Sequence, residues 1–273
     1  MAASAEDHAW INGQNLYFAD SVASGWVDPV QLAEAIGMIC NLRSFDAIGS
    51  GRQYLHRSGM VLIGDTAVIT AAYLPQYGET DDFNQALIEL PLSAGSGTRF
   101  SIEGKDYQCH EGLQGLFLPG QSMRALTAER TASLGFNLDP ARLTALLMQM
   151  APQALTAEQA RLEWQRPRII NLQDSRVREL WQWLQSLLQM LASSPLAIAQ
   201  SNGALALAIE DLLYRISLLM LCPDLIAGSS LPFSSVLPFR SDPITALSSY
   251  PVSSLTGLAA QVVSPHPTAD PGR

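Results

Sequence analysis

Short apolar runs alternate with turn residues through the middle of the chain, from about residue 53 to residue 136. Runs of this length, bounded by glycine, proline and small polar residues, predict β-strands rather than helices. The clearest predicted hairpin joins residues 98–102 to residues 105–109 through Glu103-Gly104. The predicted strands are 54–56, 60–63, 67–73, 86–92, 98–102, 105–109, 115–118 and 133–138. Short strands in this number are typical of a β-barrel or jelly roll.

The apolar pattern takes on the period of a helix after Asp139, which is an expected N-cap. Thr156 and Gln159 have the spacing of a capping box, so a second helix is expected to begin there. Two longer segments, 174–193 and 203–222, carry apolar residues at spacings of three and four. Each of these segments therefore predicts a helix with one wide apolar stripe.

These patterns predict an α+β fold in which a β-barrel is followed by a layer of helices. The lead-in contains one further expected helix, over residues 29–40. The final segment is rich in serine and proline and shows no helical stripe, so we expect it to be disordered. The expected divisions are the lead-in (1–53), the β-barrel (54–139), the helical region (140–225) and the tail (226–273).

Composition excludes several classes of function for this chain. The net charge of −9, with Lys105 as the single lysine, argues against a surface that neutralises nucleic-acid phosphates. Cys40, Cys109 and Cys222 are widely spaced and odd in number, which favours buried thiols over disulfides or a zinc knuckle. The N-terminus lacks the pattern of a signal peptide, and residues 203–222 include acidic and basic side chains, so we expect a cytoplasmic protein.

The stretch from residue 86 to residue 150 carries a more specific pattern. It begins with an apolar strand that ends in proline, continues through an arginine before a glycine hairpin, and closes with L-D-x-x-R-L at a helix start. The residues that carry this pattern are Leu87, Glu89, Pro91, Leu92, Gly95, Arg99, Gly104, Gly112, Pro119, Leu138, Asp139, Arg142 and Leu143. The pattern resembles the ligand-binding domain of AraC-type transcription regulators, and the likeness extends over roughly residues 15–225.

This resemblance implies a cupin-like barrel that binds a small effector, and helices that mediate dimerisation. It also implies a following DNA-binding half with helix-turn-helix motifs, yet residues 226–273 show no such pattern. We therefore expect a sensing and dimerisation module of an AraC-type regulator, truncated before its DNA-binding domain and without direct DNA binding. The expected partners are an unidentified small-molecule effector and a second copy or a related regulator, and no cofactor is expected.

Glu89 interrupts an otherwise apolar strand. Alternation puts Leu87, Glu89 and Pro91 on one face of that strand, and Ile88 and Leu90 on the other. Glu89 is then either outward and solvated, which we favour, or inward as a polar anchor in a ligand cavity. Tyr54, His56, Tyr73 and Arg99 are the other candidate ligand-binding residues, since each could line the mouth of a barrel.

Catalytic patterns are weak in this sequence. A metal-binding cupin would present several histidines and a carboxylate, but His56 and His110 are the only histidines of the barrel region and lack that spacing. No GxSxG motif, P-loop or dinucleotide-binding loop is present. We therefore expect neither a metal site nor catalytic residues, although a small-molecule binder without regulatory role, or a cupin metalloenzyme, remains an alternative.

The stripe of the 174–193 helix has two interpretations. It can pack inside the chain against the 203–222 helix, or it can meet its own copy across a dimer axis. The candidate interface residues are Val177, Trp181, Leu184, Leu188 and Leu191. Trp183, Leu187 and Met190 lie partly outside this stripe and broaden the apolar surface, which favours a partner.

Overall fold

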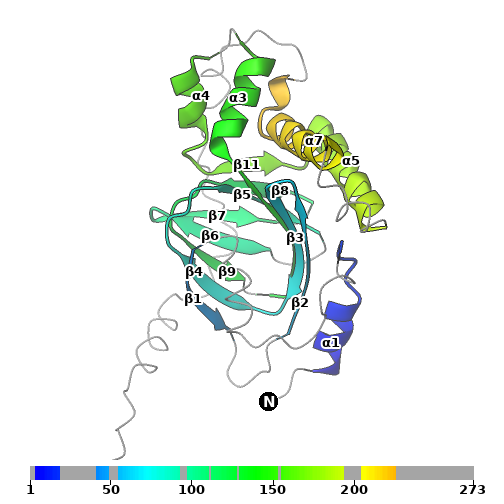
Figure 1. The fold of residues 1–273 in the computed structure, drawn as a ribbon. Helices are drawn as coiled ribbons and strands as arrows, with labels where there is room; N and C mark the ends of the chain where they lie inside the picture. The colour runs from blue at the N-terminus through cyan, green and yellow to red at the C-terminus, as the bar shows by residue number, and fades with distance from the viewer. Residues whose placement is uncertain are drawn as a thin grey trace, which may run out of the picture. The chain divides into compact units, whose positions relative to one another are not determined.

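The structure is a computed structural model that describes residues 4–18, 41–48, 55–92, 97–110, 112–127, 129–152, 155–193 and 204–225. The expected helix over 29–40, the tail and Tyr54 lie outside these residues. Within them the fold is α+β, as expected, with two antiparallel sheets and helices gathered beyond one of them (Figure 1).

One sheet, here called the helix-facing sheet, has six strands in the order β11-β8-β5-β10-β3-β2. The other, here called the outer sheet, has five strands in the order β1-β4-β9-β6-β7. The strands of the helix-facing sheet are β2 (His56–Ile63), β3 (Thr66–Tyr73), β5 (Ala86–Pro91), β8 (Gln114–Leu118), β10 (Thr131–Leu138) and β11 (Arg168–Asn171). The strands of the outer sheet are β1 (Leu42–Ala47), β4 (Gln76–Thr80), β6 (Thr98–Ile102), β7 (Lys105–Cys109) and β9 (Met123–Thr127).

The strand pairing shows that the expected β-barrel or jelly roll is not closed. Each sheet ends in its own edge strands, and no ladder joins the two sheets within the described ranges. The strands therefore form an open two-sheet sandwich. The expected hairpin between β6 and β7 is confirmed, and its turn residues Glu103 and Gly104 have φ of 51° and 75°, which suits a tight two-residue turn.

Several strands differ from those expected. In place of the two separate strands expected at 54–56 and 60–63, the structure has one continuous strand, β2, from His56 to Ile63. The strands β1, β4, β9 and β11 were not expected. Burial does not alternate regularly along β1, β4 and β9, and β11 is only four residues long, Arg168–Asn171. Polar strands of this kind are held by their ladders and neighbours more than by their own sequence.

Helices cover the helix-facing sheet on the side away from the outer sheet. They are α3 (Pro140–Met150), α4 (Ala157–Glu163), α5 (Ser175–Ala192) and α7 (Ala204–Leu221), while α1 (Ala5–Asn12) lies near β2 and a short helix, η2 (Pro223–Leu225), follows α7. Both predicted helix starts are confirmed: Asp139 caps α3, and Thr156 with Gln159 forms a capping box before α4. None of the described helices is long and apolar enough to cross a membrane.

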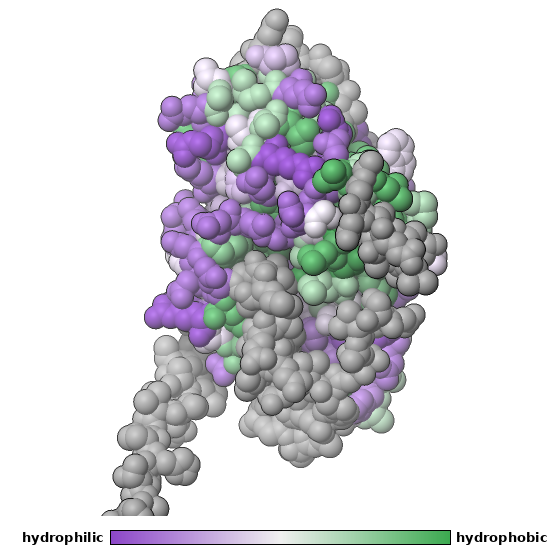
Figure 2. All heavy atoms as spheres, in the orientation of Figure 1, coloured by the Kyte–Doolittle hydropathy of each residue, from purple (hydrophilic) through white to green (hydrophobic). Residues whose placement is uncertain are grey.

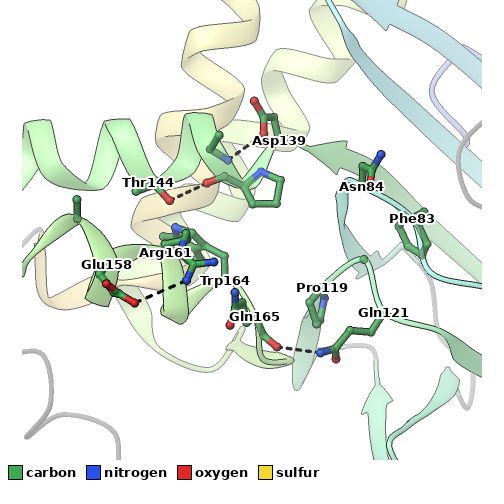
Figure 3. A pocket seen from close by; sticks show the side chains of 14 residues that line it. Phe83, Asn84, Pro119, Gln121, Asp139, Thr144, Glu158, Arg161, Trp164 and Gln165 are labelled. Atoms are coloured by element: carbon green, nitrogen blue, oxygen red, sulfur yellow. Dashed lines mark hydrogen bonds and ion pairs between the residues drawn. The ribbon is translucent and has the colours of Figure 1, made fainter.

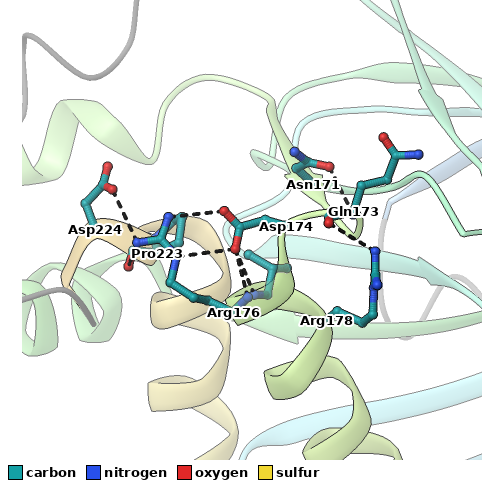
Figure 4. A network of polar contacts seen from close by, with 8 residues as sticks. Asn171, Gln173, Asp174, Arg176, Arg178, Pro223 and Asp224 are labelled. Carbon is teal, nitrogen blue, oxygen red and sulfur yellow. Dashed lines mark hydrogen bonds and ion pairs between the residues drawn. The ribbon is translucent and has the colours of Figure 1, made fainter.

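The start of α5 is tied to the end of α7 by charged side chains (Figure 4). Asp174 caps α5 by accepting a hydrogen bond of 2.8 Å from the backbone N–H of Arg176. The Arg176 guanidinium pairs with Asp174 at 3.1 Å and with Asp224 at 3.7 Å, and it donates to the carbonyl of Pro223. Bonding to Arg176 lowers the pKa of the Asp174 carboxyl, so the cap is ionised at neutral pH.

The main core lies between these helices and the helix-facing sheet. Ile88, Leu90 and Phe136 from the sheet meet the α5 stripe there. The five candidate interface residues are all buried in the chain's own core: Val177, Trp181, Leu184, Leu188 and Leu191. This placement corrects the interpretation of the stripe as an interface. The exposed apolar side chains of α5 are Trp183 and Met190, each 60% exposed.

Candidate functional site

A group of polar side chains lies between the two sheets, and we call it the interior cluster. Its members come from both sheets and are all buried, although four of them carry groups that titrate in water. The members are His56, Tyr73, Glu89, Thr98, Cys109 and Ser133.

The alternation of β5 puts Glu89 in the interior. Ile88 and Leu90 point to the helices and join the main core, so Glu89 points to the outer sheet. On this face Glu89 lies opposite Gly135 of β10 and Leu116 of β8. Leu116 belongs to a small apolar core with Phe100 of the outer sheet, which confirms that this face lies inside the sandwich.

Contacts join the members of the cluster across the sandwich. The Tyr73 and Thr98 hydroxyl oxygens are 3.3 Å apart, which connects β3 to β6. The Tyr73 ring stacks on His56 with centroids 6.2 Å apart. The Ser133 hydroxyl lies close enough to Glu89 and Tyr73 to lower the pKa of both side chains. The Cys109 thiol donates to the backbone carbonyl of Glu89 at 3.6 Å.

Burial decides the charge states in the cluster. Desolvation raises the pKa of Glu89 to about 7, and the hydrogen bond from Ser133 only partly opposes this. Desolvation lowers the pKa of His56 to about 4, so this imidazole is neutral at neutral pH. Burial also raises the pKa of the Tyr73 hydroxyl and the Cys109 thiol, so neither ionises near pH 7. Within the described residues, no basic side chain contributes to the pKa of Glu89.

The candidate ligand residues predicted from the sequence divide into three groups. His56, Tyr73 and Glu89 come together in the cluster, and the outward position favoured for Glu89 is wrong because both faces of β5 are covered. Arg99 is exposed on the outer sheet and takes no part in the cluster. Tyr54 lies outside the described residues.

Thr98, Cys109 and Ser133 were not among the candidates. The only signal for them is their register, because Thr98 pairs with Cys109 and Ser133 pairs with Pro91 on the inward face. Pairing of this kind becomes visible only once the strand order is known. Cys109 and Cys222 are buried free thiols, which confirms that expectation for two of the three cysteines.

No group of three or more histidine, cysteine, aspartate or glutamate side chains within the described ranges is placed to hold a metal ion. The cluster instead offers hydroxyls, a carboxyl and a neutral imidazole beside an apolar wall. Such a set can orient a small molecule by hydrogen bonds.

A second polar group, here called the anchor network, connects the sandwich to the helices. Glu210 of α7 is buried, and its Oε1 accepts hydrogen bonds from the Asp65 backbone at 2.9 Å and from the Thr66 hydroxyl at 3.0 Å. Its Oε2 pairs with Arg142 of α3 at 2.7 Å. The Arg142 guanidinium also lies 4.1 Å from the centre of the Tyr214 ring.

The anchor network explains what Asp139 and Arg142 of the L-D-x-x-R-L pattern do in the fold. Asp139 caps α3, and its backbone N–H donates to the Tyr214 hydroxyl at 2.7 Å. Arg142 then bridges α3 to the buried carboxylate of α7, which itself binds the β2–β3 turn. The network therefore fixes where two helices sit on the helix-facing sheet.

No protein-family model matches the chain, and no curated protein matches it. Among solved structures, the AraC-like transcriptional activator CuxR is similar at 11% identity with a TM-score of 0.38, covering 71% of this chain and 79% of that one. The EutQ protein of Clostridium difficile is similar at 12% identity with a TM-score of 0.27, covering 34% of this chain and 76% of that one. The Cupin-2 domain of an XRE family transcriptional regulator from Enterobacter cloacae is similar at 11% identity with a TM-score of 0.26, covering 30% of this chain and 94% of that one.

Proposed function

We propose that this chain is an effector-sensing and self-association module of the AraC type, with the interior cluster as its effector site. The observation that carries the proposal is the interior cluster itself. A carboxyl, three hydroxyls and an imidazole are buried between two sheets, where a wholly apolar core would be more stable. Buried polar groups of this kind are usual where a protein orients a ligand.

The effector proposed for this site is a small molecule with hydroxyl or amino groups. Its donors would meet the Glu89 carboxyl, and its acceptors would meet the hydroxyls of Tyr73 and Ser133. Its apolar part would lie against the small core around Leu116 and Phe100.

The anchor network supplies a route from the effector to the helices. Glu89 lies on β5, which pairs with β10, and β10 runs directly into the Asp139 cap of α3. A change in the position of β10 therefore acts on α3 and, through Arg142, on Glu210 of α7. We propose that effector binding alters self-association by this path.

The self-association surface is proposed on the exposed side of α5 and α7. Trp183, Met190 and Leu205 are 60%, 60% and 56% exposed, and large apolar side chains at this exposure favour a partner. Figure 2 shows hydrophobic residues gathered on the side where α5 and α7 lie, and hydrophilic residues around α4 and the outer sheet. The occupant proposed is a second copy or a related regulator.

A thermal-unfolding screen tests the effector site. Small hydroxylated and amino compounds are added to the wild-type chain, to Tyr73→Phe and to the matched control Tyr77→Phe, whose hydroxyl lies on the outer sheet. A compound that binds the cluster should stabilise the wild-type chain and the control, and stabilise Tyr73→Phe less. Equal stabilisation of all three chains by every active compound would exclude the cluster as the effector site.

Sedimentation velocity tests the second half of the proposal. We expect the chain to self-associate in the micromolar range, and an active compound to change that equilibrium. A strict monomer at high micromolar concentration contradicts the self-association role. Stabilisation by a compound without any change in association would instead identify a small-molecule binder with no such coupling.

A further inference from the structure

A pocket lies where the sandwich meets the helices, away from the interior cluster, and we call it the junction pocket. Its volume is about 940 Å³. Two loops of the sandwich line one side, at Phe83-Asn84 and at Pro119–Gln121. The start of α3 and the length of α4 line the other, as Figure 3 shows. This volume is in the range of sites for small molecules.

Trp164, at the end of α4, is the unusual residue of this pocket. It is only 2% exposed, and its indole N–H has no hydrogen-bond partner among the described residues. Its ring is held in place by an edge-on contact with Phe117 at 5.7 Å and by the Arg168 guanidinium at 5.7 Å. A buried tryptophan N–H normally finds an acceptor, so leaving this one unpaired costs free energy.

We propose that the junction pocket binds a small uncharged molecule with a flat apolar body and a carbonyl oxygen that accepts from Trp164 Nε1. The apolar body lies against Phe83, Pro119 and Pro140, which come from both sides of the pocket. This site shares no residue with the interior cluster, and the inference does not rest on the proposed function.

The charges of the lining select an uncharged ligand. Asp139 and Glu158 bring two carboxylates, and Arg161 brings one guanidinium that already pairs with Glu158 at 3.8 Å. An anion would therefore meet more negative than positive charge. A cation would gain from the carboxylates but would supply no acceptor to the indole N–H.

Access to the indole N–H requires a side-chain movement, because the nitrogen is closed off from water. Arg161 lies three residues before Trp164, on the same face of α4. Its side chain is 60% exposed and its contact with Glu158 is long, so it can swing into solvent at little cost. The Gln121 amide reaches the Gln165 carbonyl at 3.4 Å, a weak contact that a ligand can displace.

Three isosteric probes test the charge and the acceptor separately: benzamide, benzoate and benzamidinium. The readout is the indole ¹H–¹⁵N resonance of Trp164 in the full chain, which contains five tryptophans. Comparison with the spectrum of Trp164→Phe assigns that resonance. We expect benzamide to shift it downfield and to bind about tenfold more tightly than either charged probe, because only benzamide combines an acceptor with zero charge.

Matched variants separate this site from general effects of tryptophan. Trp164→Phe keeps an aromatic ring but loses the donor, and should weaken benzamide binding by about tenfold. Trp183→Phe makes the same change on the exposed side of α5 and should leave binding unchanged. If Trp164→Phe fails to fold, single phenylalanine substitutions at the other four tryptophans assign the wild-type Trp164 resonance by elimination, and that resonance then reports benzamide binding.

Three results would overturn the proposal. The first is a Trp164 resonance that stays in place through a benzamide titration to the solubility limit. The second is tighter binding of benzoate or benzamidinium than of benzamide. The third is a loss of binding in Trp183→Phe as large as that in Trp164→Phe.

Discussion

Replacing Glu89 by glutamine should change how the stability of the chain depends on pH. Burial raises the pKa of Glu89 from 4.5 to about 7 in the folded chain. Because this pKa is raised, the carboxyl stabilises the fold fully below pH 4.5, and that contribution is lost as pH rises to about 7. At about 1.4 kcal/mol per pH unit, the loss is about 3 kcal/mol. The glutamine side chain of Glu89→Gln cannot ionise, so this variant should not show this loss of unfolding free energy.

His56 makes a contribution of opposite sign in the same range. Burial lowers its pKa from 6.5 to about 4, so its neutral form stabilises the fold above pH 6.5, and that stability is lost as pH falls towards 4. The two contributions largely cancel in the wild-type chain. A flat wild-type profile is therefore uninformative, and the quantity to measure is the difference between Glu89→Gln and wild type.

Urea unfolding from pH 5.5 to pH 8 measures that difference while avoiding the pI of about 4.8, where association is strongest. Over this range the free energy of unfolding of Glu89→Gln, relative to wild type, should increase by about 2 kcal/mol. The control Glu103→Gln, at the exposed β6–β7 turn, should show no such trend. A difference that stays constant with pH would refute the assignment of Glu89 as a buried, protonated carboxyl.

Three further predictions concern the anchor network and the exposed helices. Glu210→Ala should lower the free energy of unfolding by about 3–5 kcal/mol in urea titrations, because it leaves several buried hydrogen-bond donors without an acceptor. The control Asp211→Ala breaks a more exposed ion pair and should cost about 1 kcal/mol or less. Gly64→Ala should lower the free energy of unfolding by at least about 1 kcal/mol more than Gly104→Ala. Both glycines have positive φ, but only a Cβ at residue 64 would lie 2.5 Å from the Glu210 carboxylate. Equal losses for the two variants would mean that the turn at Gly64 can move away from Glu210. Trp183→Ser should weaken self-association about tenfold in sedimentation experiments while changing stability by less than about 0.5 kcal/mol, and an unchanged dissociation constant would place the interface elsewhere.

Local features of the fold could be predicted from the sequence because neighbouring residues carry them. Asp139 caps α3 through hydrogen bonds to residues just beyond it, and Thr156 with Gln159 does the same for α4. The β6–β7 hairpin depends on Glu103-Gly104, because a tight two-residue turn requires the positive φ angles of these residues. The apolar stripe of α5 predicted a buried helix face, whichever partner covered it.

Only the tertiary structure decided what the polar residues do. The alternation of β5 placed Glu89 opposite Ile88 and Leu90, but it could not show that water is excluded from both faces; that depends on the outer sheet lying across one and the helices across the other. The α5 stripe likewise packs within the chain because α7 and the sheet cover it, which leaves Trp183 and Met190 as the exposed large apolar side chains of α5. Glu210 finds the Asp65 backbone 145 positions earlier in the chain. Contacts between residues so far apart in the chain depend on how sheets and helices stack, and they cannot be predicted from the pattern of neighbouring residues along the chain.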